Sequence, residues 1–131
     1  MTKLKIRVTK EILDRSKYCG SSIDNCAIAQ AVRLIFPDAC VSHQYIFPFS
    51  IPCSGTTAEI VAKLGVENII KLPEEAYCFI CDFDRNSVED RPRMRELEFE
   101  VEISDQIIEK INIEELKPLL ENHPTLQLIE N

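Results

Sequence analysis

Two segments of the chain alternate strictly between apolar and charged residues. In KLKIRV (residues 3–8) three apolar side chains alternate with three cations, and in ELEFEVEI (96–103) four apolar side chains alternate with four glutamates. A period of two is typical of a strand buried on one face. Because the polar faces carry opposite charges, we expect the two strands to pair and to form cross-strand ion pairs. Such pairs would set the register, since a one-residue slip would bring charges into the core.

Two further segments have the composition and end signals of buried helices. The first, DNCAIAQAVRLIF (24–36), is apolar on nearly all sides, with Asp24 as a candidate N-cap and Pro37 as a stop. The second, PEEAYCFICDF (73–83), starts with Pro73 and carries two glutamates in its first turn, as helix starts commonly do. These are the two main helices that the sequence predicts.

Shorter elements are predicted in the middle of the chain. ACVSHQYIFPFSI (39–51) is rich in β-branched and aromatic residues and predicts a strand, and VENIIKL (66–72) predicts a brief second one. Between them, Thr56 and Glu59 have the spacing of a capping box, and Gly65 is a candidate C-cap. A short helix is therefore expected before Gly65.

These elements predict an α+β fold, with a mainly antiparallel sheet packed against the two main helices. Residues 1–103 form the predicted domain, and residues 104–131 form a C-terminal appendage of one or two short helices and a closing strand, TLQLI (125–129). Two roles are open for the appendage. It contacts another subunit, or it packs on its own domain.

The net charge of −7 is spread unevenly. Residues 1–20 carry +4, whereas residues 96–131 carry −8. This balance argues against binding to duplex nucleic acid, which relies on many phosphate-neutralising cations. No apolar stretch approaches the roughly 20 residues that span a bilayer, and the N-terminus lacks the apolar run of a signal peptide. We therefore expect no membrane association and a cytoplasmic location.

No motif in the sequence predicts catalysis, a metal or a cofactor. Of the six cysteines, Cys78 and Cys81 form a CxxC, but no second CxxC or paired histidines accompany it. Buried structural thiols are the favoured interpretation, and a metal or redox site is the alternative. Asp82 and Asp84 are the weak candidates for acid–base chemistry. A non-enzymatic protein without metal or cofactor is expected.

One locally basic segment stands out in this acidic chain. Four arginines lie within eleven residues, namely Arg85, Arg91, Arg93 and Arg95. The planar guanidinium binds phosphate through two hydrogen bonds and also stacks on bases, and the nearby Asn86 is a candidate for a base or ribose edge. The aromatic candidates for stacking on a base are Phe79, Phe83 and Tyr45. This composition suits a small phosphate-bearing ligand.

A second interpretation of the same segment is a solvated surface patch. Carboxylates lie among and beside the arginines, at Glu89, Asp90 and Glu96. They are able to neutralise the arginines in surface ion pairs that contribute little to stability or binding. The sequence leaves both interpretations open.

Several segments together resemble a group of small phage and prophage proteins. The resemblance rests on KIRVTKEIL (5–13), DNCAIAQAVR (24–33), LPEEAYCFICDFD (72–84) and ELEFEVEI (96–103). The characterised proteins that this pattern resembles are the Thoeris anti-defence sponges of the first type. The tail after residue 103 lies outside the resemblance, and Pro92 is a departure within the arginine run.

The resemblance implies a function and a set of contacts. Such sponges are oligomers that sequester cyclic ADP-ribose isomers, and some hold cyclic oligonucleotides, without degrading them. Their ligand is bound by an aromatic residue, an asparagine and arginines four positions apart. Arg91 and Arg95 have this spacing here, and Asn86 with Phe79 or Phe83 are the nearest equivalents.

We therefore expect a homo-oligomer that sequesters a cyclic nucleotide immune signal and so counteracts anti-phage defence. Arg91 and Arg95 would bind phosphates, with Arg85 and Arg93 beside them. The alternative is an acidic inhibitor of the anti-CRISPR or DNA-mimic type. It would bind a protein partner through the glutamates of residues 96–102 and the tail.

Overall fold

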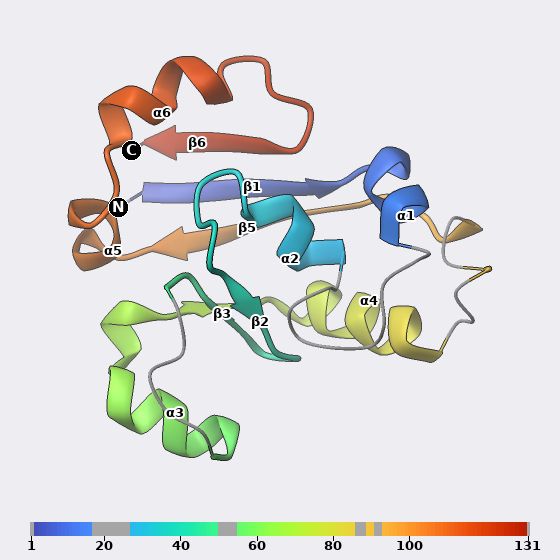
Figure 1. The fold of residues 1–131 in the computed structure, drawn as a ribbon, viewed down its shortest axis with the longest axis horizontal. Coiled ribbons are helices and arrows are strands. Elements are labelled where there is room, and N and C mark those ends of the chain that lie inside the picture. Colours follow the sequence, from blue (N-terminus) through green and yellow to red (C-terminus); the bar gives the residue numbers. More distant parts are fainter. Residues whose placement is uncertain (1, 17–26, 50–54, 86–88, 91–92, 131) are drawn as a thin grey trace.

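The fold is α+β in the computed structural model, which describes residues 2–16, 27–49, 55–85, 89–90 and 93–130. These residues form two antiparallel three-stranded sheets and six α-helices (Figure 1). The α+β class expected from the sequence is thereby confirmed. None of the helices in these ranges has the length and apolar character needed to cross a membrane.

The first sheet contains both alternating segments as neighbours. Its strands are β1 (Thr2–Val8), β5 (Leu97–Ile103) and β6 (Leu126–Glu130), in the order β5-β1-β6. Lys5 Nζ lies 2.8 Å from Glu98 Oε1, and Arg7 Nη2 lies 3.1 Å from Glu96 Oε1. The predicted pairing of oppositely charged strands is confirmed. The ion pairs run diagonally, because residues 5 and 7 lie directly opposite residues 100 and 98.

The apolar face of this sheet carries the core. Leu4, Ile6 and Val8 of β1 are fully buried, and the alternate residues of β5 lie beside them. The helix α2 (Ala27–Val32) packs against β1 and α1 (Lys10–Ser16), whereas α4 (Glu74–Arg85) packs against β5.

The first predicted main helix ends earlier than expected. α2 stops at Val32, four residues before the predicted end, and the chain continues in turns. The Ile35 N–H donates to Val32 O in a three-residue step, and Arg33 Nη2 donates to Ala39 O at 3.1 Å. These hydrogen bonds satisfy backbone polar groups after α2 without a further turn of α-helix. Residues 24–26, including the predicted cap Asp24, lie outside the described ranges.

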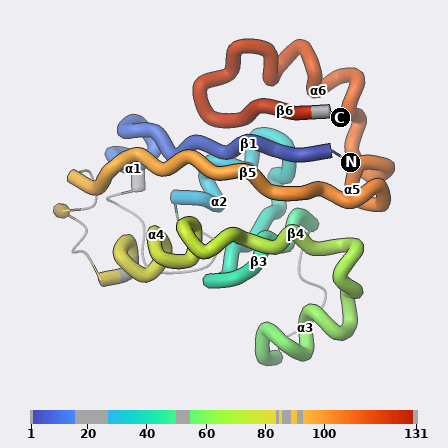
Figure 2. Tube along the Cα trace, turned by 180° about the vertical axis from the view of Figure 1, so that it is seen from behind, coloured from blue at the N-terminus to red at the C-terminus, as the bar shows by residue number. Residues whose placement is uncertain are grey.

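The second sheet contains β2 (Cys40–Val41), β3 (Tyr45–Phe47) and β4 (Ile70–Lys71), in that order. Its edge strand β4 lies beside β5 (Figure 2). The single strand predicted over residues 39–51 is wrong, because the chain reverses between β2 and β3. Ser42 Oγ accepts hydrogen bonds from the backbone N–H groups of Gln44 and Tyr45, at 3.4 and 3.1 Å. A side-chain bond of this kind favours a turn over a continuous strand.

The N-cap half of the predicted capping box is confirmed in α3 (Thr57–Leu64). Thr56 Oγ1 accepts the N–H of Glu59 at 3.2 Å, and Gly65 closes the helix with φ +83°. This φ is unfavourable for residues with a Cβ atom. A short 3-10 helix, η1 (Val66–Asn68), then leads into β4.

Residues 104–130 complete the first sheet rather than standing apart from it. They form α5 (Asp105–Glu109), α6 (Ile113–Leu120) and β6. Ile107, Leu120 and Leu126 belong to the same buried cluster as β1 and β5. Packing on the chain's own domain is therefore visible in the structure, and the expected contact with another subunit stays a prediction.

Candidate functional site

The basic segment lies where α4 ends and β5 begins. Arg85 is the last residue of α4, Arg93 lies in a short turn, and Arg95 precedes β5 by two residues. All three are exposed, and we refer to them as the arginine corner. Arg91 and Asn86, which the sequence assigns to the same site, lie outside the described residues.

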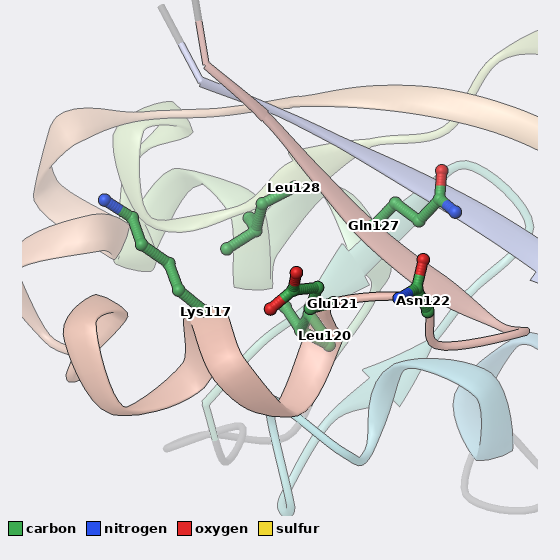
Figure 3. A pocket seen from close by; sticks show the side chains of 6 residues that line it. All are labelled: Lys117, Leu120, Glu121, Asn122, Gln127 and Leu128. Atoms are coloured by element: carbon green, nitrogen blue, oxygen red, sulfur yellow. The ribbon is translucent and has the colours of Figure 1, made fainter.

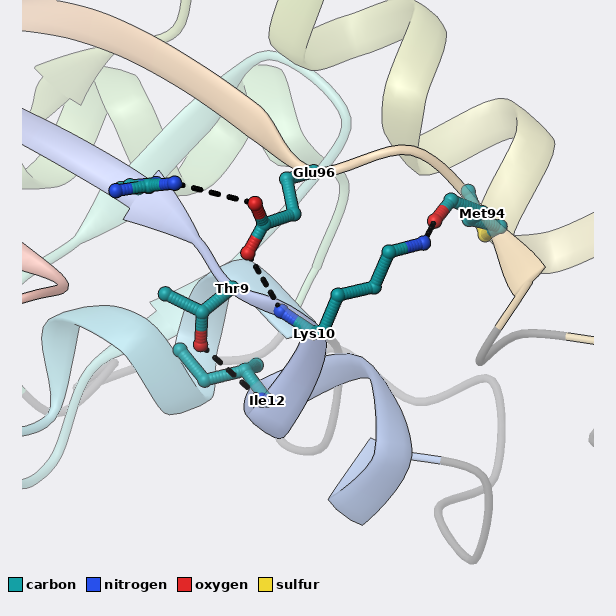
Figure 4. Close-up of polar contacts among 6 residues, drawn as sticks. Thr9, Lys10, Ile12, Met94 and Glu96 are labelled. Atoms are coloured by element: carbon teal, nitrogen blue, oxygen red, sulfur yellow. Dashed lines mark hydrogen bonds and ion pairs between the residues drawn. The ribbon is translucent and has the colours of Figure 1, made fainter.

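A set of hydrogen bonds ties the backbone beside Arg95 to the first strand and helix (Figure 4). Glu96 Oε2 accepts the backbone N–H of Lys10 at 2.8 Å, and its Oε1 accepts from Arg7 at 3.1 Å. Lys10 Nζ donates to the carbonyl oxygen of Met94. Thr9 Oγ1 accepts the Ile12 N–H in the first turn of α1. The backbone on both sides of Arg95 is thus held against β1 and α1.

This arrangement determines how far the neighbouring carboxylates neutralise the positive charge of the arginine corner. Glu96 binds Arg7 and Lys10, so it is not the partner of the adjacent Arg95. In the part of the chain that the structure describes, Arg95 makes no ion pair. Arg93 Nη1 lies 3.6 Å from Asp90 Oδ1, but the Arg93 side chain is 84% exposed, and such a pair contributes little. A guanidinium therefore stays available for an external anion.

The aromatic rings that the sequence suggests for stacking on a base are less favourably placed than the arginines. Phe79 and Phe83 stack on each other with ring centroids 6.2 Å apart, and only 8% and 1% of their surfaces are exposed. Both rings are part of the core, so a stacking role would require that part of the core to open. Tyr45 is half-buried in the other sheet and packs against Phe47. The described structure gives the arginine corner no exposed aromatic ring from this set.

The CxxC lies on a partly exposed side of α4. Cys78 is exposed and Cys81 is half-buried, so the expectation of two buried thiols is wrong for Cys78. The hydrogen bond with Cys81 raises the pKa of the exposed Tyr77 hydroxyl, whose ring contacts His43. Among the described residues, no three metal-binding side chains gather in one place.

Sequence reasoning missed a hollow between α6 and β6 (Figure 3). It has a volume of about 460 Å³, with Lys117 and Glu121 contributed by the α6 side and Gln127 and Leu128 by β6. No motif marks it, because it exists only once β6 has paired with β1. Asn122, with φ +59°, turns the chain from one side of this hollow to the other.

Comparisons with protein-family models, with curated proteins and with solved structures find no match for this chain. The case for a function therefore depends on the geometry of the corner.

The role of Glu96 has a consequence for acid stability. The hydrogen bond from the Lys10 N–H, supported by Arg7, lowers the pKa of Glu96 below its ordinary value of 4.5. The stability that ionised Glu96 contributes is thus present above pH 4.5 and is lost as the pH falls through its lower folded-state pKa. We expect Glu96→Gln to be destabilising at about pH 7, and we expect this deficit to shrink as the pH falls below 4.5.

Urea unfolding across this pH range measures the difference. Glu100→Gln is the matched control, since Glu100 lies on the same strand face without these bonds. A Glu96→Gln deficit that stays constant with pH would contradict the assigned role of the ionised carboxylate.

Proposed function

We propose that the protein binds a small phosphate-bearing cyclic nucleotide at the arginine corner and sequesters it without chemical change. The observation that carries the proposal is the pairing of Glu96 with Arg7 and Lys10, which leaves the exposed Arg95 without a carboxylate partner among the described residues. An unpaired guanidinium on a tethered backbone is suited to bidentate binding of phosphate.

The fixed backbone adds to the fit. Because Met94 and Glu96 are both bonded to Lys10, the main chain at Arg95 needs little ordering when a ligand arrives. Preorganisation of this kind lowers the entropic cost of binding. Arg93 and Arg85 lie on the same corner, and Arg91 is proposed as the partner of Arg95 from its spacing of four residues.

The resemblance to the Thoeris anti-defence sponges supplies the ligand class. The proposed ligand is a cyclic ADP-ribose isomer or a cyclic oligonucleotide, and its removal would counteract anti-phage signalling in the host cytoplasm. The same resemblance supports a homo-oligomer. No catalytic step, metal or cofactor is needed, since sequestration requires binding alone.

A rival function is supported by the exposed face of β5. Glu98, Glu100 and Glu102 are exposed on one sheet face, and of these three only Glu98 has an ion-pair partner in the described structure. Such a row suits a basic protein partner, as in an acidic inhibitor. Glu96 does not belong to this row, because its carboxylate is already bound.

Direct binding separates the two functions. The purified protein is titrated calorimetrically with cyclic ADP-ribose isomers and with cyclic oligonucleotides, and the bound ligand is recovered by heating and examined by mass spectrometry. We expect tight binding and an intact ligand. Arg95→Ala should weaken binding about 10–100-fold, as loss of a charge-assisted hydrogen bond does, and Arg91→Ala with Arg95→Ala should abolish it.

Lys63→Ala serves as the charge-matched control, because Lys63 is exposed in α3, away from the corner. Binding should be unchanged in this variant, and all variants should melt near the wild-type temperature. Absence of binding to every nucleotide would refute the proposal and favour the acidic inhibitor. Recovery of an altered ligand would instead indicate an enzyme.

A further inference from the structure

A second hollow, of about 330 Å³, lies where the charged face of the first sheet meets the turn before β6. It shares Asn122 and Gln127 with the hollow of Figure 3. We call it the β1–β6 pocket, and its lining consists of Lys5, Arg7, Glu98, Asn122, His123, Pro124, Thr125 and Gln127. Nearly all of these side chains are polar.

Backbone bonds hold the turn against the sheet. The Arg7 N–H donates to Thr125 O at 2.7 Å, and Gln127 lies directly opposite Lys5 in the strand register. His123 Nδ1 accepts the backbone N–H groups of Thr125 and Leu126, at 3.1 and 3.2 Å. These bonds define the pocket wall without using the charged groups of β1.

The hydrogen bonds of His123 also define its tautomer. A ring nitrogen that accepts hydrogen bonds carries no proton, so in the neutral ring the proton is on Nε2. The imidazole in the pocket wall is therefore a hydrogen-bond donor at Nε2. The side-chain amides of Asn122 and Gln127 each add two more N–H donors.

The hydrogen-bond donors of the lining favour an anion. Two cations, Lys5 and Arg7, lie there with one carboxylate, Glu98, which binds Lys5 at 2.8 Å. Arg7 is bonded to Glu96 through one guanidinium nitrogen, Nη2, so other N–H donors of its fork remain. Each cation is thus paired with one carboxylate, Lys5 with Glu98 and Arg7 with Glu96, and the wall offers more hydrogen-bond donors than acceptors.

We propose that the β1–β6 pocket binds the phosphate group of a small phosphomonoester. Lys5, Arg7 and the Nε2–H of His123 supply charge-assisted and neutral donors to the phosphate oxygens. The volume exceeds that of a phosphate ion and lies at the lower end of the range for small-molecule sites, which leaves room for the esterified group. Glu98 is the acceptor available to a hydroxyl of that group.

This site is distinct from the proposed nucleotide site. Arg85, Arg93 and Arg95 do not line the pocket, and five of its eight lining residues lie beyond residue 103. The two proposals can therefore fail separately. Loss of phosphate binding says nothing against the corner, and loss of nucleotide binding in Arg95→Ala says nothing against the pocket.

The test is an NMR titration of the full chain with inorganic phosphate and with glycerol 3-phosphate, against sodium chloride at equal ionic strength. The side-chain amide signals of Asn122 and Gln127 should shift saturably with both phosphate probes. Tighter binding of glycerol 3-phosphate would identify the monoester as the preferred ligand. Tighter binding of inorganic phosphate would identify the free ion as the ligand and overturn the monoester assignment.

Two variants test the donors. Lys5→Gln removes a cation, and His123→Asn removes the Nε2–H donor while its amide oxygen replaces Nδ1 as the acceptor for the backbone. Each should weaken binding at least about tenfold with little change in melting temperature. Lys3→Gln is the matched control, since Lys3 points to the same sheet face but does not line the pocket.

His123→Gln distinguishes a ligand-binding role of the His123 ring from a merely structural one. Its amide nitrogen replaces the Nε2–H donor, whereas the acceptor for the turn is lost, so it should retain more affinity than His123→Asn. The proposal is overturned if neither probe gives a saturable shift. It is also overturned if Lys3→Gln weakens binding as much as Lys5→Gln, or if His123→Asn binds like the wild type.

Discussion

Phe83→Ala is expected to lower the free energy of unfolding by about 3–5 kcal/mol, the usual cost of removing a buried phenylalanine ring. The Phe83 ring is 1% exposed and stacks on Phe79 between α4 and the sheet. Its removal leaves a cavity in the main core cluster. Urea unfolding followed by circular dichroism measures the loss.

Two further variants separate packing from ligand contact. Tyr77→Ala, on the same helix but 42% exposed, should cost about 1 kcal/mol or less. Phe83→Leu should recover most of the lost stability, because it refills much of the cavity. If Phe83→Ala left stability unchanged but abolished nucleotide binding, the ring would be a ligand contact, as the sequence alone suggested.

Leu126→Ala is expected to have the second large effect, lowering the free energy of unfolding by about 2–5 kcal/mol. Leu126 is fully buried and lies opposite Ile6 in the register of β6 on β1. The substitution therefore damages the same core that β1 and β5 form. Thermal and urea unfolding should show one cooperative transition at a lower midpoint.

Leu119→Ala is the matched control, since Leu119 lies in the same C-terminal segment but is 59% exposed. Its effect should stay within about 0.5 kcal/mol. Equal and small effects of both substitutions would show that the segment is an appendage that adds little to the stability of the domain. A large effect of Leu119→Ala alone would indicate a subunit contact.

Local pattern was sufficient to predict the β1–β5 pair of the first sheet, but not the position of β6 on the other side of β1. The alternation in residues 3–8 and 96–103, with opposite charges on the polar faces, predicted both strands and their pairing. It was insufficient for residues 39–51, where composition favoured a strand throughout. There the chain reverses in a turn where Ser42 Oγ accepts the Tyr45 N–H and the Ser42 N–H donates to Tyr45 O, and local bonds of this kind favour a turn over a strand.

The core positions of the aromatic residues of α4 were predictable from their spacing in the sequence. Ala76, Phe79, Ile80 and Phe83 follow the spacing of one helix face, and all four are buried. That spacing predicts a core position for both rings, with Cys78 on another side. The state of Arg95 was not predictable, because it depends on the contact of Glu96 with the start of α1, 86 residues away in sequence.

The order of the β5-β1-β6 sheet also affects how the chain folds while it is being synthesised. Its central strand is made first, yet both strands that pair with it begin at Leu97 or later. During translation the apolar face of β1 therefore stays without its sheet neighbours until most of the chain has left the ribosome. Pairings this distant slow folding and lengthen the time during which an unpaired apolar strand is open to aggregation.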